Sequence, residues 1–139
     1  MTARVLPPTP ESLARAADIL RIGGLVAMPT ETVYGLACDG TNADAVACLY
    51  EAKGRPSFNP LIAHVASQAM AEREAVFSPL ARKTAEHFWP GPLTLVLTVA
   101  KTGKVCDLAR AGLDTIALRR PAHPVAQALL DTFNDPLVA

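Results

Sequence analysis

The sequence predicts an α/β fold (α+β under stricter definitions) in which helices pack on a twisted sheet, mixed or mainly parallel. Short apolar runs typical of buried strands alternate with segments of helical periodicity, and no internal repeat or low-complexity linker interrupts them. The chain has 139 residues, of which 50% are hydrophobic and 19% charged, as in a globular domain. We therefore expect a single domain over residues 1–139.

The N-terminal segment contains a helix start followed by two strands. Thr9-Pro10-Glu11 combines an N-cap hydroxyl, a first-turn proline and a first-turn acid, and Gly23-Gly24 ends the helix. The apolar run over residues 25–29 ends in proline and is interpreted as a buried strand. A second short strand is expected over residues 36–40.

Two helices and a strand are expected in the middle of the chain. Thr41 with Asp44 resembles a capping box, which would open a helix that ends at Lys53. Residues 61–65 form an apolar run typical of a strand, and Ser67 after it can cap a short helix.

The last third of the chain continues the alternation. Ser78-Pro79 begins a helix that Pro90-Gly91-Pro92 terminates. The remaining elements are expected to be strands over residues 93–99, 115–119 and 136–139 and a helix over residues 125–133. Because a strand begins at the final residues, we expect the sequence to be the N-terminal fragment of a longer chain, with the sheet incomplete at its C-terminal end.

The composition argues against several classes of protein. Thirteen basic residues balance thirteen acidic ones, which disfavours a strongly basic nucleic-acid binder. The longest apolar run, residues 93–100, is too short to span a bilayer, and prolines interrupt the N-terminus where a signal sequence needs an apolar core. We therefore expect a cytoplasmic protein without membrane partners. Cys38, Cys48 and Cys106 lack C-x-x-C spacing, which favours free thiols over a disulfide or a zinc site.

The segment Lys53–Leu61 is the strongest candidate for binding an anion. Lys53 and Arg55 would project to one side of an extended segment, because Pro56 restricts Arg55 to extended backbone. An ammonium group beside a planar guanidinium suits phosphate or carboxylate. A solvated basic turn after a helix is the alternative interpretation.

Three hydroxyl side chains follow the first strand. Thr30, Thr32 and Tyr34 would share one face if the backbone were extended, and hydroxyls can donate to and accept from a small polar ligand. The alternative is that the threonines reflect β-propensity and that the tyrosine fills the core.

Two further polar groups lie within or at the end of apolar strands. His64 is either a satisfied core histidine or part of a site. Arg119 and Arg120 would point to opposite faces of their strand, so at most one of them joins a given site. The sequence contains no cluster of metal ligands, no Walker-type phosphate loop, no dinucleotide-binding glycine motif and no serine-hydrolase elbow.

Four motifs occur in order along the chain. They are P-T-E-T-V-Y-G-L at residues 29–36, K-G-R-P with the N-P-L that follows it at 53–61, W-P-G-P-L-T at 89–94, and R-x-P-x-H-P at 119–124. Together they resemble the threonylcarbamoyl-AMP synthase family, the YrdC-like proteins. The resemblance covers nearly the whole chain and implies a YrdC/RibB-like twisted mixed sheet.

The resemblance also implies an activity. The family forms threonylcarbamoyl-AMP and pyrophosphate from L-threonine, bicarbonate or carbon dioxide, and ATP, with Mg²⁺ arriving on the ATP. Downstream proteins pass the threonylcarbamoyl group to tRNA, so tRNA and those proteins are the implied partners. Lys53 and Arg55 would be the catalytic residues that hold the phosphates, and Asn59 would complete the nucleotide site. The residues implied for substrate binding are Thr30, Thr32, Tyr34, His64 and Arg119.

Two other functions fit the same resemblance. One is an RNA-binding module, against which zero net charge and 5% aromatic residues argue. The other is the carbamoyl-adenylate domain of a hydrogenase-maturation carbamoyltransferase, in which acylphosphatase and zinc-finger segments precede the domain. The family also has an S-x-N motif after a strand that resembles residues 136–139. Because the sequence ends before that motif, we expect residues 1–139 alone to be a poor catalyst.

Overall fold

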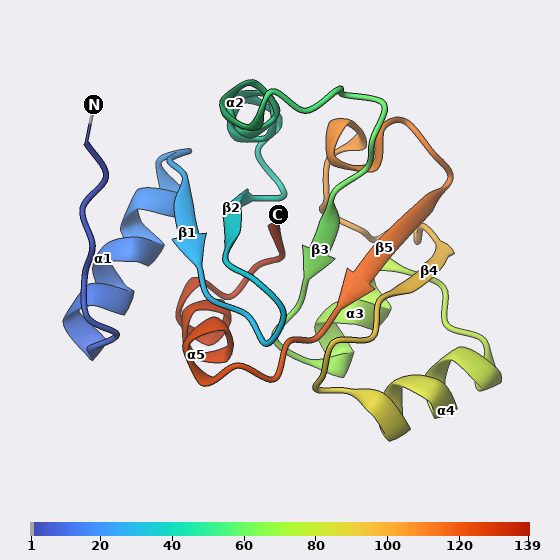
Figure 1. Cartoon of the computed structure of the whole chain (residues 1–139). Helices are drawn as coiled ribbons and strands as arrows, with labels where there is room; N and C mark the ends of the chain where they lie inside the picture. Colours follow the sequence, from blue (N-terminus) through green and yellow to red (C-terminus); the bar gives the residue numbers. More distant parts are fainter. Residues whose placement is uncertain (1) are drawn as a thin grey trace.

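The structure is a computed structural model that describes residues 2–139 (Figure 1). Its helices are α1 (Pro10–Arg21), α2 (Ala43–Lys53), α3 (Gln68–Glu74), α4 (Pro79–Phe88), α5 (Pro124–Phe133) and the 3-10 turn η1 (Asp107–Arg110). Its strands are β1 (Val26–Met28), β2 (Gly35–Asp39), β3 (Ile62–His64), β4 (Leu95–Thr98), β5 (Thr115–Arg119) and β6 (Leu137–Val138). The expected alternation of helices and strands is therefore present.

The strands form one six-stranded mixed sheet in the order β1-β2-β6-β3-β5-β4. Within residues 2–139, β3 and β5 pair in parallel, and the other neighbouring strands pair antiparallel. The expectation of a mixed sheet is confirmed, and the alternative of a mainly parallel sheet is wrong. The reason is visible at β1 and β2, since the loop over residues 29–34 that joins them is too short for the crossover that parallel neighbours need.

Most helix starts lie where the capping residues predict them. The side chains of Thr9, Ser67 and Ser78 each accept a hydrogen bond from a backbone N–H in the first turn of α1, α3 and α4. The capping box at Thr41 is wrong, because Asn42 caps α2 by accepting from the backbone N–H groups of residues 44 and 45. The Thr41 hydroxyl instead donates to Asp39, at 2.7 Å.

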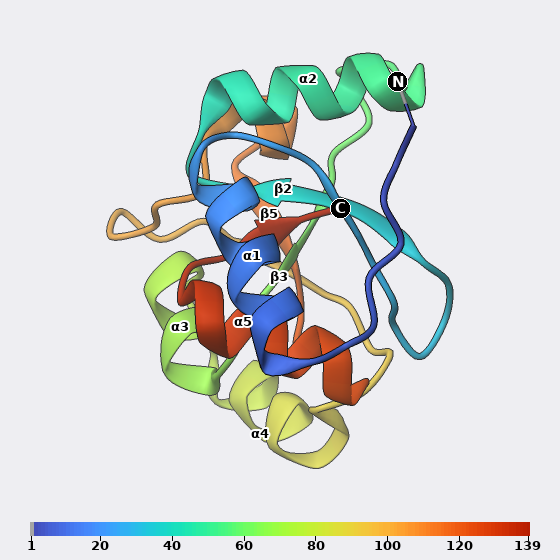
Figure 2. The same cartoon turned by 90° about the vertical axis from the view of Figure 1, so that its left-hand side faces the viewer.

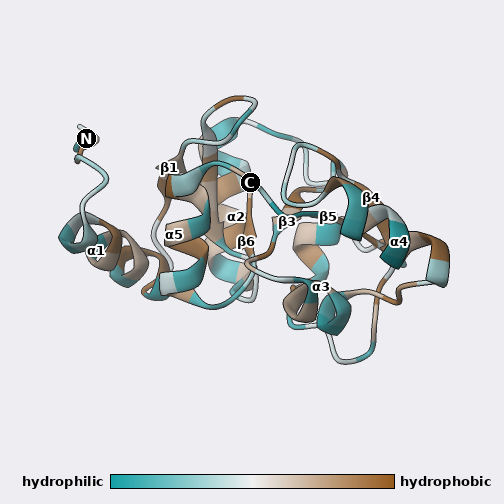
Figure 3. Cartoon of the chain, turned by 90° about the horizontal axis from the view of Figure 1, so that it is seen from below, coloured by the Kyte–Doolittle hydropathy of each residue, from teal (hydrophilic) through white to brown (hydrophobic). Residues whose placement is uncertain are grey.

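Helices cover the sheet unevenly. Helices α1 and α5 lie side by side, and their buried residues pack with β1, β2 and β6 in one apolar cluster (Figures 1 and 2). A larger cluster joins α2, α3, α4 and η1 to the other face. Figure 3, which colours the chain by hydropathy, shows hydrophobic stretches in both α5 and α2. Each face of the sheet therefore has its own apolar layer.

In the part of the chain that the structure describes, the α5 face of the sheet is only partly covered over β3, β5 and β4. Leu137 of β6 is buried beneath α1 and α5, and His64 lies opposite it on the next strand. Farther along the same face, residues of β3, β5 and β4 are only partly buried or exposed, and Val96 is 64% exposed. The strand registers align these residues in rows, which are His64 with Arg119, then Ile62 with Ala117 and Val96, then Thr115 with Thr98. This partly open strip of sheet provides the floor of the candidate site.

Candidate functional site

Three segments far apart in the sequence meet at the end of β5. The Arg119 guanidinium donates through Nε and Nη2 to the hydroxyl of Thr94, at 3.2 and 3.1 Å. Its Nη1 lies 3.5 Å from the hydroxyl of Thr32, in the loop between β1 and β2. The carboxylate of Glu31 in the same loop accepts from the backbone N–H of Ala122. These contacts attach the β1–β2 loop to the strand end that carries Arg119.

The β1–β2 loop is not extended, so the expectation that its three hydroxyls share one face is wrong. The Thr30 hydroxyl donates to the carbonyl of Val33 at 2.6 Å and lies 3.0 Å from the hydroxyl of Thr32. A threonine hydroxyl that bonds nearby backbone in this way folds a turn and competes with strand pairing. Tyr34 is 73% exposed and therefore does not fill the core. Of the three hydroxyls, only that of Thr32 meets Arg119.

His64 lies on β3 directly beside Arg119 in the register and is 3% exposed. Its Nδ1 is 3.1 Å from the carbonyl oxygen of Ile62. Burial, and next the positive charge of Arg119, lower the pKa of His64 from 6.5 to about 4. The imidazole is therefore neutral at pH 7, and it adds no second positive charge beside the guanidinium.

The low pKa of His64 predicts a loss of stability in mild acid. Between pH 6.5 and 4 the unfolded chain binds a proton at this residue that the folded chain does not, so stability falls as the pH is lowered through that window. A change in pKa from 6.5 to about 4 corresponds to roughly 3 kcal/mol of unfolding free energy. Denaturant unfolding of the His64→Gln variant should show a smaller fall between pH 6.5 and 5 than the unchanged chain.

The matched control for this measurement is His87→Gln, since His87 is exposed near the end of α4. It should keep the full pH dependence of the unchanged chain. Equal slopes for the unchanged chain and the His64→Gln variant would contradict the assigned cause.

The basic turn has a different backbone from the one expected. Lys53 is the last residue of α2, and Gly54 follows with φ of 59°, the left-handed conformation that glycine adopts without strain. The two cations therefore do not lie on an extended segment. Arg55 bends over its own loop and donates through Nε and Nη2 to the carbonyl oxygens of Asn59 and Pro60, at 3.2 and 2.8 Å.

The basic turn and the Arg119 cluster lie at opposite ends of the partly open strip. The turn leads into the start of β3, whereas His64 and Arg119 lie at the ends of the parallel strands β3 and β5. The three residues of β3 cover roughly 10 Å, at about 3.3 Å per residue. The structure therefore separates the candidate phosphate residues from the candidate amino-acid residues by the length of a strand.

Two polar contacts of this cluster were not among the expected site residues. Thr94 is the final residue of the W-P-G-P-L-T motif, and Glu31 belongs to the P-T-E-T motif. Their positions within the motifs were the only signal in the sequence, because neither side chain lies near Arg119 along the chain.

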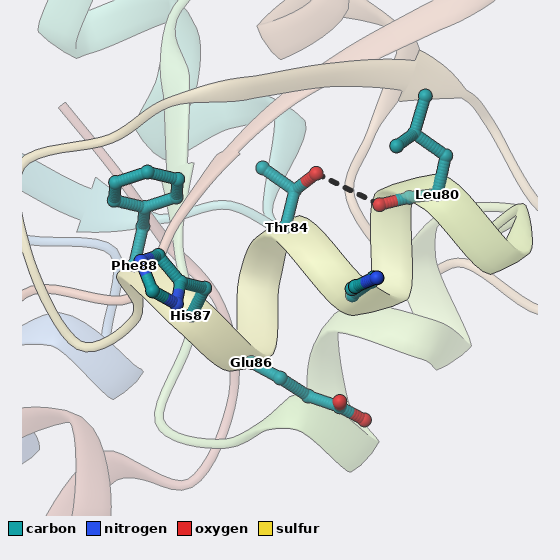
Figure 4. A pocket seen from close by; sticks show the side chains of 6 residues that line it. Leu80, Thr84, Glu86, His87 and Phe88 are labelled. Carbon is teal, nitrogen blue, oxygen red and sulfur yellow. Dashed lines mark hydrogen bonds between the residues drawn. The ribbon is translucent and has the colours of Figure 1, made fainter.

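Hollows elsewhere on the surface do not coincide with the Arg119 cluster. One, of about 500 Å³, lies on α4 (Figure 4) and is lined by Leu80, Lys83, Thr84, Glu86, His87 and Phe88. Another, of about 440 Å³, borders the basic turn at Ser57 and Phe58. Both are shallow surface features, and the α4 hollow is displaced from the strip that joins the basic turn to Arg119.

Residues 2–139 hold neither a metal-binding cluster of side chains nor a membrane-spanning helix. No three histidine, cysteine or acidic side chains in this part of the chain are grouped so that they could hold a metal ion. None of its helices has the length and apolar character required to cross a membrane.

Comparison with known proteins identifies relatives along nearly the whole chain. The Sua5/YciO/YrdC family model, described as "Telomere recombination", matches residues 18–139. The threonylcarbamoyl-AMP synthase of Bacillus subtilis (strain 168) is 47% identical over 128 residues, which are 91% of this chain and 37% of the relative. That of Halorhodospira halophila (strain DSM 244 / SL1) is 44% identical over 133 residues, 94% of this chain and 68% of the relative. The chain thus spans 37% of the first relative's length.

Solved structures agree with this relationship. The structure of P. abyssi Sua5 complexed with L-threonine is 43% identical and has a TM-score of 0.88, covering 98% of this chain and 39% of that one. T. kodakarensis HypF has a TM-score of 0.78 at 22% identity, over 92% of this chain and 16% of that one, which shows a shared fold alone. On the family model and the synthase relatives together, the chain belongs to the Sua5/YciO/YrdC family, the family of the threonylcarbamoyl-AMP synthases.

Proposed function

We propose that the protein is a threonylcarbamoyl-AMP synthase that forms threonylcarbamoyl-AMP and pyrophosphate from L-threonine, bicarbonate or carbon dioxide, and ATP. The observation that carries the proposal is the meeting of Arg119 with Thr32 and Thr94, since it joins three of the four motifs in one place. The 43% identity to P. abyssi Sua5, whose structure holds L-threonine, supports an amino acid as the ligand of this cluster.

The chemistry of the cluster suits an amino acid. A guanidinium group binds a carboxylate through two parallel hydrogen bonds, and hydroxyls nearby can bond the threonine side chain. We assign the threonine carboxylate to Arg119, with the β1–β2 loop residues Thr30, Thr32 and Tyr34 around the amino acid. We place the buried, neutral imidazole of His64 beside Arg119 at the base of the amino-acid site, where it adds no positive charge.

The reaction then takes place along the strip of sheet between the two ends. The neutral threonine amine adds to carbon dioxide and releases a proton to solvent, which gives a carbamate anion. A carbamate oxygen attacks the α-phosphorus of ATP, the bond to the β-phosphate oxygen breaks, and pyrophosphate leaves. Such a transfer depends mainly on positioning and on stabilising negative charge. We assign that role to Lys53 and Arg55 and propose that Asn59 completes the nucleotide site.

Lys53 and Arg55 differ in what they contact, which makes their roles separable. The ammonium group of Lys53 is exposed and has no hydrogen-bond or ion-pair partner in residues 2–139, so it is free to meet phosphate. The Arg55 guanidinium closes its own loop, so it contributes both to the shape of the turn and to its charge. We further propose that Mg²⁺ accompanies ATP, because Mg²⁺ binds nucleotide phosphates and keeps several waters.

In the full-length protein, alanine replacement of either cation should abolish pyrophosphate release that depends on ATP, threonine and bicarbonate. Lys53→Ala should leave thermal stability unchanged, whereas Arg55→Ala should cost about 1 kcal/mol because two loop carbonyls lose their donor. The measurements are pyrophosphate release, ATP binding by calorimetry and thermal unfolding. Lys83→Ala, which removes an exposed lysine from α4, is the matched control. Near-normal release and ATP binding by the Lys53→Ala variant would contradict the phosphate role.

The wider role follows from the same proposal. We propose that the protein acts in the cytoplasm and that downstream proteins transfer the threonylcarbamoyl group to tRNA. If the protein bound RNA directly through many phosphates, its RNA affinity would fall steeply with salt concentration. The balanced charges of this chain predict only a weak dependence of RNA affinity on salt. The HypF likeness extends to the fold and so gives the hydrogenase-maturation alternative no support at the level of activity.

A further inference from the structure

We propose that Thr94 is a positioning residue that aims the Arg119 guanidinium at the substrate carboxylate. This inference rests on the proposed function, because it concerns how the same site holds its amino acid. It assigns a role to a side chain that none of the site expectations included.

The geometry of the guanidinium supports the assignment. Arginine has five N–H donors in a rigid planar fork and no acceptor, so the Thr94 hydroxyl oxygen is the acceptor of both contacts. Nε and Nη2 donate to that one oxygen, which fixes the plane and rotation of the group. The contact from Nη1 to Thr32 is long, at 3.5 Å. The edge formed by Nη1 and Nη2 therefore keeps donors for a carboxylate.

The charge of Arg119 is also left for a ligand. Within residues 2–139 no carboxylate lies within 4.0 Å of its nitrogens, whereas Arg21, Arg73, Arg82 and Arg110 each have an acidic partner. Thr94 supplies a neutral acceptor in place of an acidic one. It orients the guanidinium without neutralising it, which suits a residue that must bind an anion.

The fold explains why Thr94 is in the right place. Leu95 pairs with Leu118 in the antiparallel register of β4 and β5, so Thr94 falls opposite Arg119 and on the same face of the sheet. The residue before it is fixed by a hydrogen bond from the indole Nε1 of Trp89 to the carbonyl of Leu93, at 2.8 Å. The W-P-G-P-L-T motif thus anchors the start of β4 and sets the position of its last residue.

Removing the hydroxyl while keeping the shape of the side chain should weaken L-threonine binding. Thr94→Val is expected to lower the affinity for L-threonine about tenfold, because the guanidinium loses the acceptor that orients it. Thr94→Ser keeps the hydroxyl and should restore most of the affinity. ATP affinity should be the same in all three proteins, because the basic turn lies at the other end of the strip.

The test is calorimetric titration of the full-length protein, unchanged and with each substitution, with L-threonine and, separately, with ATP. The Thr94→Val change is also introduced beside Arg119→Lys, whose side chain lacks the fork that Thr94 orients. If Thr94 acts through Arg119, the added Thr94→Val change costs no further affinity there. Thr94→Ala serves as a second hydroxyl-free variant should thermal unfolding show that Thr94→Val is destabilised.

The outcomes separate the two proposals. Absence of L-threonine binding by the unchanged chain overturns the proposed function and the role of Thr94 with it. If the unchanged chain binds L-threonine and the Thr94→Val and Thr94→Ala variants bind it equally well, the role of Thr94 alone is overturned. Thr94 has a structural role, and not a positioning one, if Thr94→Val lowers the L-threonine affinity tenfold in the Arg119→Lys protein as well. The same conclusion holds if Thr94→Ser does not restore the affinity.

Discussion

Replacing Arg119 with alanine is expected to weaken L-threonine binding about a hundredfold, because the carboxylate that we assign to this residue would lose two charge-assisted hydrogen bonds. The effect should be confined to the amino acid, since the basic turn lies at the other end of the strip of sheet. Calorimetric titration with L-threonine and with ATP measures both affinities. The expected result is a large loss for L-threonine with ATP binding retained.

The control for Arg119→Ala removes the same charge from a different place. Arg82 on α4 pairs with Glu72 on α3 at the surface, and Arg82→Ala should leave L-threonine affinity unchanged. Unaltered L-threonine binding by the Arg119→Ala variant would refute the assignment of the carboxylate to this residue. An equal loss of ATP binding would instead indicate that the two ends of the strip are not independent.

Replacing Glu74 with glutamine is expected to lower the free energy of unfolding by about 3 kcal/mol. The Glu74 side chain is fully buried at the end of α3. Its carboxylate accepts from the backbone N–H groups of Lys104 and Val105, at 2.7 and 2.8 Å, and pairs with Arg73 at 3.1 Å. A glutamine amide could keep one oxygen for the two backbone N–H groups, but its NH2 group would then face the Arg73 guanidinium, which would lose its charged acceptor.

The same carboxylate fixes the loop after β4. Gly103 passes so close that a Cβ there would lie 3.3 Å from the Glu74 carboxylate. The backbone of Ala100 donates to the carbonyl of Glu74, at 2.9 Å. Loss of this anchor should therefore raise amide hydrogen exchange over residues 100–105 as well as lower the midpoint of denaturant unfolding.

Glu72→Gln is the matched control, since it makes the same substitution two residues earlier on α3. Glu72 pairs with Arg82 at the surface, where ion pairs contribute little to stability. We expect the Glu72→Gln variant to unfold close to the unchanged chain. Similar midpoints for the Glu74→Gln and Glu72→Gln variants would contradict the anchoring role of Glu74.

Local signals in the sequence account for most of the secondary structure. Thr9, Ser67 and Ser78 cap helices because a hydroxyl at the N-cap satisfies a backbone N–H whatever the rest of the fold does. The error at α2 is also local, since Thr41 and Asn42 can both cap and the structure uses the amide of Asn42. Strand order was less predictable, because the position of β6 between β2 and β3 depends on packing between distant segments.

Site prediction had a similar limit. Motif order led to Lys53, Arg55, His64 and Arg119, but an extended backbone was a poor guide to how the side chains point. Helix α2 includes Lys53, and Gly54 after it has the left-handed conformation. In the β1–β2 loop, the Thr30 hydroxyl bonds the Val33 carbonyl and folds the backbone into a turn. Both features arise from local hydrogen bonds that compete with an extended strand.

By itself the sequence determined the alternation of helices and strands, the family and the residue types available for two substrates, because caps, apolar periodicity and motifs act over a few residues. Only the tertiary structure decided which of those residues meet. The contacts of Arg119 with Thr32 and Thr94 join residues that are 87 and 25 positions away. The buried contacts of Glu74 reach across 30 residues. Such contacts depend on sheet order and strand register, which arise when the whole chain packs.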